Sequence, residues 1–173
     1  MDEVTAGMGR EELAAYIAAE NIDATIIELD EPTPTVETAA EAVGTHPSQI
    51  IKSLLFLIKR ENGEFDPLLV ITNGTDRVDY VALARFAGTS RRSIRIANAE
   101  QVEALTGYQV GAVPPFGHKQ PLPTLLDETV LEQDVIYGGG GTSHALMRVS
   151  VDELRRVLPD AAVAAVTQSS TTS

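Results

Sequence analysis

The residue with the most unusual chemical setting is Lys52, which interrupts the most apolar stretch of the chain, residues 49–59 (QIIKSLLFLIK). An ammonium group enclosed by apolar side chains is costly, so it must pair, lose its proton or face a cavity. A lysine that faces a pocket could contact a phosphate, a carbonyl oxygen or a carboxylate. The alternative is a lysine on an edge strand whose head group reaches water. The spacing alone leaves both interpretations open.

A second candidate is the segment of residues 111–117 (GAVPPFG), in which two consecutive prolines stiffen a loop between glycines. A stiff loop holds its backbone N–H groups in fixed directions, and such groups can stabilise an oxyanion or orient a water. The amides that could do so belong to Gly111, Ala112, Val113, Phe116 and Gly117. The alternative is a rigid connector that buries Phe116.

Four glycines at 138–141 and three histidines complete the candidates. The glycine run has neither G-x-G-x-x-G nor a GK[ST] ending, so a nucleotide phosphate loop is not expected. His46, His118 and His144 lack metal-ligand spacing, so the sequence predicts no metal site. His118 and His144 are of interest because each adjoins one of the two glycine-rich segments.

Composition indicates one globular domain. The chain has 173 residues, of which 43% are hydrophobic, and we expect a single domain over residues 1–166 with a disordered tail at 167–173. It contains no cysteine, which excludes thiolate catalysis, cysteine-bound zinc, iron–sulfur clusters and disulfides. Neither a signal peptide nor an apolar run of about 20 residues is present, so the sequence favours the cytoplasm and no membrane partner.

Charge is distributed unevenly. The net charge of −12 taken alone disfavours a nucleic-acid partner. However, residues 1–47 hold eleven acidic residues and one basic residue, whereas residues 77–119 hold six basic residues and three acidic ones. A locally positive surface is therefore possible, with an ordinary solvated surface as the alternative. The six basic residues are Arg77, Arg85, Arg91, Arg92, Arg95 and Lys119.

Helices and strands are expected to alternate irregularly along the chain. Capping residues and glycines predict helices over residues 10–20, 36–43, 80–87, 98–105 and 150–158. Apolar and β-branched runs predict strands over residues 25–29, 49–59, 67–72, 93–96, 124–126, 135–137, 145–149 and 162–166, with the second and third forming a hairpin. This pattern favours an α+β fold with a curved, partly barrel-like mixed sheet surrounded by helices.

Four of these stretches also occur together in a known family. They are residues 52–53 (KS), 76–84 (DRVDYVALA), 106–127 (TGYQVGAVPPFGHKQPLPTLLD) and 136–141 (IYGGGG). In this order and spacing the chain resembles the YbaK family of aminoacyl-tRNA deacylases, which are relatives of the editing domain inserted in bacterial prolyl-tRNA synthetases. The resemblance runs from about residue 25 to residue 158.

The resemblance implies hydrolysis of the ester between a wrong amino acid and the 3′ end of a tRNA, without a cofactor. It implies catalytic roles for Lys52 and for the G-x-x-x-P loop from Gly111 to Pro115, and a substrate-binding role for Ser53. The remaining substrate-binding candidates are Ala112, Val113, Pro114, Phe116, Gly117, His118, Gly139, Gly140, Gly141 and His144. The implied partners are mischarged tRNA, contacted by the six basic residues, and an aminoacyl-tRNA synthetase, but not DNA.

Two departures from the family pattern keep other functions open. Many members have Ser or Thr where this chain has Pro114, and cysteine-selective members carry an acid shortly after the glycine turn, where this chain has His144, Ala145 and Leu146. Cysteine selectivity is therefore not expected. The alternatives to a hydrolase are a non-catalytic module that binds aminoacyl-tRNA or a synthetase, and an esterase for small molecules.

Overall fold

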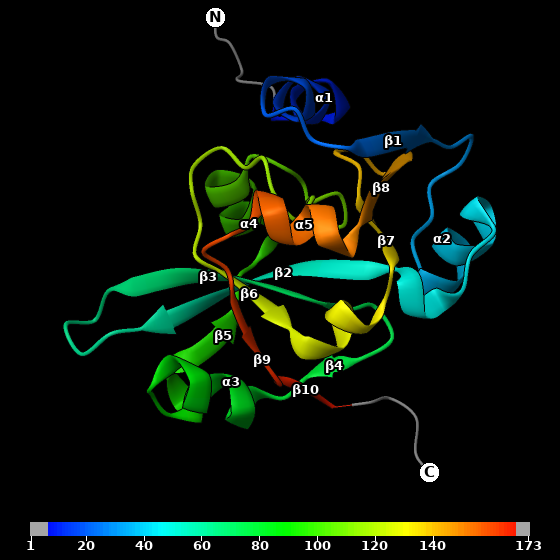
Figure 1. The fold of residues 1–173 in the computed structure, drawn as a ribbon. Coiled ribbons are helices and arrows are strands. Elements are labelled where there is room, and N and C mark those ends of the chain that lie inside the picture. Colours follow the sequence, from blue (N-terminus) through cyan, green and yellow to red (C-terminus); the bar gives the residue numbers. More distant parts are fainter. Residues whose placement is uncertain (1–6, 169–173) are drawn as a thin grey trace, which may run out of the picture.

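A computed structural model describes residues 7–168 of the chain (Figure 1). The α-helices are α1 (Arg10–Ala19), α2 (Val36–Val43), α3 (Tyr80–Ala87), α4 (Ala99–Thr106) and α5 (Val151–Val157), and the short 3-10 helices are η1 (Pro47–Gln49), η2 (Arg91–Ser93) and η3 (Glu128–Glu132). The strands are β1 (Ala24–Glu28), β2 (Ile51–Lys59), β3 (Phe65–Asn73), β4 (Arg77–Val78), β5 (Ile94–Ile96), β6 (Thr124–Asp127), β7 (Val135–Gly139), β8 (Ala145–Ser150), β9 (Ala162–Ala164) and β10 (Thr167–Gln168). Within residues 7–168, no helix combines the length and apolarity that crossing a membrane requires.

The central sheet has five strands in the order β5-β2-β3-β6-β9. The predicted hairpin forms its middle, because β2 and β3 pair antiparallel along their whole length, with Lys52 opposite Thr72. A second sheet, β1-β8-β7, meets the first through one parallel bridge between Ile50 and Tyr137. Helices occur together with antiparallel and parallel strand pairs, so the predicted α+β class with a mixed sheet is confirmed, although the sheet does not close into a barrel.

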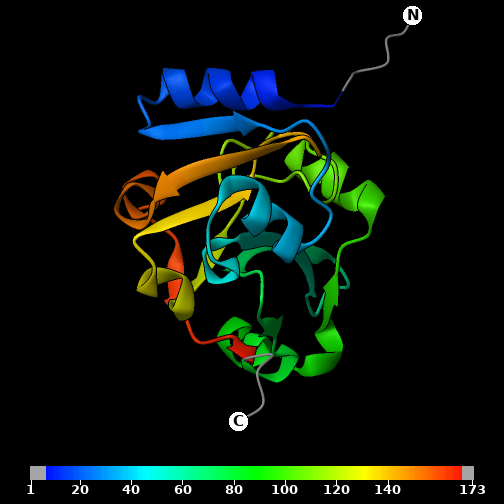
Figure 2. The same cartoon turned by 90° about the vertical axis from the view of Figure 1, so that its right-hand side faces the viewer.

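The apolar core lies on both faces of the central sheet. Ile51, Leu55 and Leu69 pack on one face with the buried Phe116, whereas Phe56 and Val70 pack on the other face against α3. Figure 1 shows α3 below this sheet and α4 and α5 above it, and Figure 2 shows α1 running alongside β1 at the top. The alternation of apolar side chains along β2 therefore supplies two cores at once.

Three helices begin and end where local sequence predicts. Side chains of Thr35, Asp79 and Asn98 accept hydrogen bonds from the first turns of α2, α3 and α4. Each of these helices ends on a glycine with positive φ, a conformation that side-chain-bearing residues rarely adopt. These ends depend on contacts only a few residues apart, which is why the sequence predicts them well.

The start of β2 and the C-terminal end of the fold differ from the prediction. Strand β2 starts at Ile51, because residues 47–49 form a 3-10 turn capped by His46. Thr167 and Gln168, predicted to be disordered, pair with β4, while residues 169–173 of the predicted tail lie outside the described residues. The fully buried Asp127 holds this C-terminal strand in place, since its carboxylate accepts bonds from the Val166 amide at 2.8 Å and the Thr167 hydroxyl at 3.0 Å.

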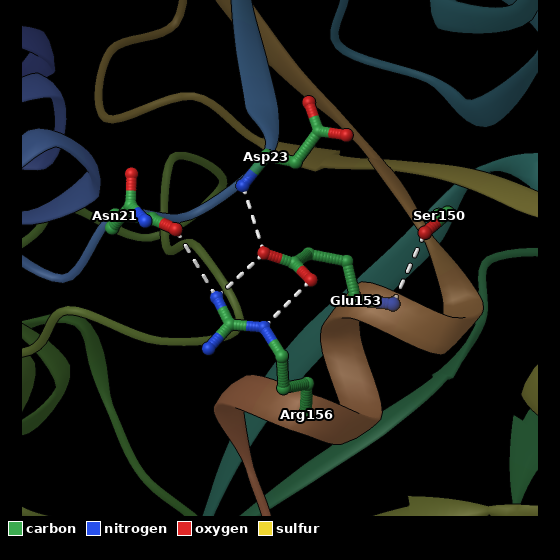
Figure 3. A network of polar contacts seen from close by, with 5 residues as sticks. All are labelled: Asn21, Asp23, Ser150, Glu153 and Arg156. Atoms are coloured by element: carbon green, nitrogen blue, oxygen red, sulfur yellow. Dashed lines mark hydrogen bonds and ion pairs between the residues drawn. The ribbon is translucent and has the colours of Figure 1, made fainter.

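A polar network ties α5 to the turn that precedes β1 (Figure 3). The Glu153 carboxylate accepts hydrogen bonds from Arg156 and from the Asp23 amide, the latter at 2.8 Å, and Arg156 also donates to the Asn21 carbonyl oxygen. Ser150 caps α5, since its hydroxyl accepts from the Glu153 amide at 3.0 Å, while the Glu153 side chain turns toward Asp23 and Arg156.

This network predicts an acid-sensitive contribution to stability. The hydrogen bonds from Arg156 and Asp23 lower the pKa of Glu153 to about 2. A carboxylate with a lowered pKa in the folded state stabilises the fold above its ordinary pKa, and this contribution is lost as the pH falls toward 2. We expect Glu153→Gln to lower the urea midpoint at neutral pH and to flatten its dependence on pH in the acid range. The matched control is Glu61→Gln, on the exposed turn after β2, and equal acid limbs for both variants would contradict the prediction.

Candidate functional site

A cavity of about 290 Å³ lies beside the first half of β2, and Lys52 is the one ionisable side chain among the residues that line it. One wall is residues 33–36 with Ala39, a second is residues 50–55, and a third combines β5 and α4 with the predicted loop and the glycine turn. The lining residues of this third wall are Ile96, Ala97, Val102, Val110, Gly111, Val113, Gly138, Gly139 and Leu146. We call this space the Lys52 cavity. It is small and mostly apolar, and Lys52 is the one charged residue in its lining.

The cavity exists because β2 has an open edge. One edge of β2 pairs with β3. On the other edge, β5 pairs only with Phe56–Ile58, and a single bridge joins the preceding residue, Ile50, to Tyr137. The Ile50 carbonyl accepts from Gly74 on the β3 side, whereas the Leu55 carbonyl accepts from Ala97 on the opposite side. Backbone groups alternate in direction along a strand, so Ser53, like Leu55, directs its N–H and C=O away from β3 and toward the open edge.

Ser53 also brings an unused hydroxyl to the cavity. Its Oγ is buried and has no hydrogen-bond partner within the described residues. Buried hydroxyl groups normally have a partner, and an unpaired one costs roughly 1–3 kcal/mol. The Ser53 hydroxyl is therefore a polar group in the cavity wall that is available for a hydrogen bond to a ligand.

Lys52 is more exposed than its neighbours suggest. Lys52 is exposed, whereas Ile51 and Leu55 on the same strand are buried. Alternation places the Lys52 and Ser53 side chains on opposite faces of β2, yet both residues line the cavity at the strand edge. Lys52 is therefore both an exposed residue and a lining residue of the cavity, so the two interpretations of the sequence do not exclude each other.

The proline-braced loop supplies two residues to the cavity, Gly111 and Val113. Neither amide donates a hydrogen bond to an acceptor within the described residues, although Val113 is buried. The Ala112 amide, in contrast, donates to the Gln109 carbonyl at 3.0 Å and is already used. Phe116 is buried and stacks with Tyr16 at 6.0 Å between ring centroids, so the loop is also the rigid connector described by the alternative.

The glycine turn allows this loop to approach closely. A Cβ atom added at Gly139 would overlap the Val113 carbonyl oxygen and lie 2.7 Å from the carbonyl group of Ala112. A Cβ at Gly140 would lie 2.6 Å from the backbone of Ala145, and the Gly141 amide donates to the Ala112 carbonyl at 3.1 Å. These glycines are needed because backbone packs directly on backbone.

Other predicted site residues lie apart from the Lys52 cavity. Residues 115–119 line a second cavity of about 350 Å³ together with Tyr16, and this space is referred to as the rear cavity. Pro115, Phe116, Gly117 and His118 belong to the rear cavity, and Ala112, Pro114, Gly140, Gly141 and His144 line neither cavity. His144 is exposed, with its Nδ1 3.1 Å from the Ser143 hydroxyl.

Sequence reasoning missed the wall formed by residues 33–36 and by Leu146. The prolines of residues 31–35 (EPTPT) were interpretable as a break between elements. Their repetition just before a helix cap was a signal of a stiff segment that could line a site. Leu146 stood out only as part of a stretch that departs from the family pattern, and its place in the wall depends on how β8 packs against α2.

The basic residues follow α3, η2 and β5 toward the cavity. Arg85, Arg91, Arg92 and Arg95 are exposed, and the next residues along the chain, Ile96 and Ala97, line the cavity. The Arg91 guanidinium stacks over Tyr80 at 4.2 Å and that of Arg95 over Phe65 at 4.3 Å, so both are held in place. Arg77 lies on β4 and Lys119 lines the rear cavity.

In the part of the chain that the structure describes, no group of three or more His, Asp or Glu side chains is placed to hold a metal ion. The polar groups among the residues that line the Lys52 cavity are the lysine, the hydroxyls of Thr33, Thr35 and Ser53, and backbone groups.

Comparisons with known proteins identify the family. The family model of the aminoacyl-tRNA editing domain matches residues 30–157. The chain is 35% identical to a proline–tRNA ligase of Limosilactobacillus fermentum over 54% of its own length, but it spans only 16% of that ligase. It is 27% identical to the multifunctional Ser/Thr-tRNA deacylase ProXp-y of Escherichia coli, covering 92% of this chain and 95% of that one. A solved structure described as a candidate trans-editing enzyme for prolyl-tRNA synthetase superposes with a TM-score of 0.81 and 32% identity, covering 96% of this chain and 99% of that chain.

Proposed function

Because the chain belongs to the family of aminoacyl-tRNA editing domains, we propose that it acts in trans to hydrolyse the ester of mischarged aminoacyl-tRNA. The observation that supports this proposal is that one cationic residue, Lys52, and two loop residues whose amides have no acceptor among the described residues, Gly111 and Val113, line a single small cavity. Ester hydrolysis passes through a tetrahedral oxyanion, and a cation with preorganised amides stabilises such a charge.

The proposed reaction adds a water to the ester carbonyl carbon and then breaks the bond from that carbon to the ribose oxygen. The amides of Gly111 and Val113 hold the carbonyl oxygen as it becomes negative, and the Lys52 ammonium opposes the developing charge. The cavity wall contains neither a carboxylate nor an imidazole to serve as a general base. A neighbouring ribose hydroxyl of the tRNA therefore passes the proton of the water to the leaving ribose oxygen, releasing the amino acid and a deacylated tRNA.

The cavity restricts which amino acid can be removed. Its volume of about 290 Å³ lies at the low end of the range for ligand pockets, roughly 300–1,000 Å³. Apart from Lys52 and the hydroxyl-bearing residues Thr33, Thr35 and Ser53, side chains such as Ile51, Val113 and Leu146 make the wall apolar. We therefore expect small uncharged aminoacyl groups to enter, while bulky or charged ones are excluded.

The exposed arginines form the proposed path of the tRNA. Replacing Arg91 and Arg92 together by alanine should raise KM for aminoacyl-tRNA while leaving kcat at saturation unchanged. Each lost phosphate contact reduces the slope of log affinity against log salt by about 0.7–0.9, so the double variant should have a slope that is shallower by about 1–2. The measurement is the salt dependence of kcat/KM.

The matched control removes the same charge elsewhere. Arg148 on β8 and Arg155 on α5 are exposed and line neither cavity, so replacing both by alanine should preserve the slope. Equal slopes for the two double variants would show that the arginines of η2 do not contact the tRNA.

A panel of mischarged tRNAs tests the proposed function directly. The purified protein is mixed with alanyl-, seryl- and cysteinyl-tRNAs, and release of the amino acid is followed beside binding of the same tRNAs. Hydrolysis of at least one supports the deacylase. Binding without turnover would instead indicate a non-catalytic module, and activity confined to free aminoacyl esters would indicate a small-molecule esterase.

We propose a synthetase as a second partner and the cytoplasm as the compartment. The similarity to a segment of proline–tRNA ligases supports the first, because there an equivalent sequence is part of the synthetase chain. The cytoplasm follows from the proposed substrate, because aminoacyl-tRNA is used in translation.

A further inference from the structure

The loop that carries Gly111 and Val113 accepts hydrogen bonds at several of its carbonyl groups, and these bonds fix its conformation. The Ala112 carbonyl accepts from the Gly141 amide at 3.1 Å, and the Gly117 carbonyl accepts from the Tyr108 hydroxyl at 3.2 Å. Burial raises the pKa of Tyr108 to about 12, so this phenol remains a donor at neutral pH. Between these two, the carbonyl of Pro114 accepts a hydrogen bond from the side chain of the residue that directly follows the loop.

That side chain is His118, whose Nε2 lies 2.7 Å from the Pro114 carbonyl oxygen. A carbonyl can only accept, so Nε2 carries the proton in this contact. Burial lowers the pKa of His118 below its usual value, which keeps the imidazole neutral at neutral pH with that proton in place. His118 lines the rear cavity and not the Lys52 cavity, so it is placed to support the loop rather than to contact the ester.

The Pro114 carbonyl cannot easily find another hydrogen-bond donor in place of His118. Pro114 is buried, and the rings of Pro114 and Pro115 fix both φ angles next to this carbonyl. Without His118 the carbonyl would be buried and unpaired, which is unfavourable. It could then turn toward another donor only by rotation about ψ of Pro114, and this rotation displaces the chain that leads back to Val113.

We propose that His118 is a positioning residue for deacylation: its hydrogen bond to the Pro114 carbonyl fixes the loop so that the Gly111 and Val113 amides stay directed at the substrate. This role rests on the proposed function and replaces the expectation that His118 binds substrate. In this proposal the two sides of the loop have separate roles. The side facing the Lys52 cavity stabilises the oxyanion, and the side facing the rear cavity fixes the conformation of the loop.

The test compares His118→Phe, which keeps a ring but lacks the donor, with His118→Gln, whose amide nitrogen can take the place of Nε2. Single-turnover deacylation, KM for aminoacyl-tRNA and thermal unfolding are measured for each. Because small displacements of reacting groups can cost up to about a hundredfold in rate, we expect His118→Phe to lower the single-turnover rate about ten- to a hundredfold with KM unchanged. His118→Gln should recover most of the rate, and His46→Gln, at an exposed histidine outside both cavities, should match the unaltered protein.

The outcomes separate the two proposals. If the unaltered protein deacylates tRNA and folded His118→Phe is equally fast, the positioning role is wrong while the proposed function stands. Equal losses in the Phe and Gln variants also overturn it, because the donor would then be irrelevant. An unaltered protein that hydrolyses none of the tRNAs overturns both proposals. Should His118→Phe unfold at the assay temperature, His118→Asn, whose amide is too short to reach Pro114, takes its place and must show the same loss.

Discussion

Replacing Lys52 by alanine should lower the single-turnover rate of deacylation by about a hundredfold or more while the protein remains folded. Loss of one group that stabilises an oxyanion typically costs about 3 kcal/mol in the transition state. Lys52 is exposed and forms no ion pair with a described carboxylate, so its removal leaves no buried charge unpaired. The effect should therefore appear in the rate and not in the melting temperature.

Lys59→Ala is the matched control for this experiment. Lys59 is an exposed lysine on the same strand, β2, but it lies at the far end, outside the Lys52 cavity. The control should retain the activity of the unaltered protein at every salt concentration. If Lys52→Ala deacylated every susceptible aminoacyl-tRNA at the unaltered rate, Lys52 would have no part in the chemistry.

Gly139→Ala should affect both folding and activity, because backbone atoms occupy the space that its Cβ needs. The Val113 carbonyl oxygen and the Ala112 carbonyl group fill that space, so the loop must move away from β7 to admit a methyl group. Overpacking typically costs 1–3 kcal/mol, and backbone neighbours that cannot repack place this site at about 3 kcal/mol. In a chain of this size that corresponds to a fall in Tm of about 6–12 °C. Displacement of Val113 should also reduce the deacylation rate by about a hundredfold.

Gly9→Ala provides the comparison for this substitution. Gly9 precedes α1 with φ of −146°, and the nearest atom to an added Cβ would be 3.7 Å away. The φ angle of Gly139 is likewise outside the positive range, so both variants avoid backbone strain and differ mainly in the space available. A Gly139→Ala protein with the melting temperature and rate of Gly9→Ala would show that the glycine turn does not hold the loop.

Helix ends and the presence of a stiff loop could be read from neighbouring residues. Thr35 and Gly44 define α2 because a cap and a left-handed glycine act within a few residues of each other. The hairpin of β2 and β3 was similarly predictable from two apolar runs separated by a turn. The motifs around Lys52 and Pro115 were sufficient to suggest the family, which the match over residues 30–157 confirms.

The positions of the side chains around the site depended on contacts far apart in sequence. Glu153 bonds the Asp23 amide instead of its own helix start, and Asp127 orders Thr167, a residue that looks disordered by composition. In both cases a buried or partly buried carboxylate bonds a group that is far away in sequence and is brought close only by the fold. The residues next to each carboxylate in the sequence do not indicate which group this is.

The sequence by itself determined that a cation adjoins apolar residues, that two prolines stiffen a loop, and that glycines permit close packing, because these are properties of residue types and their immediate neighbours. Only the tertiary structure decided that β2 leaves an edge open beside Lys52 and that the loop presents Gly111 and Val113 to that edge while His118 lies behind. The physical reason is that strand pairing and loop packing join segments some 60 residues apart, such as Lys52 and Gly111, and the gain in burial that selects one arrangement is a property of the whole fold.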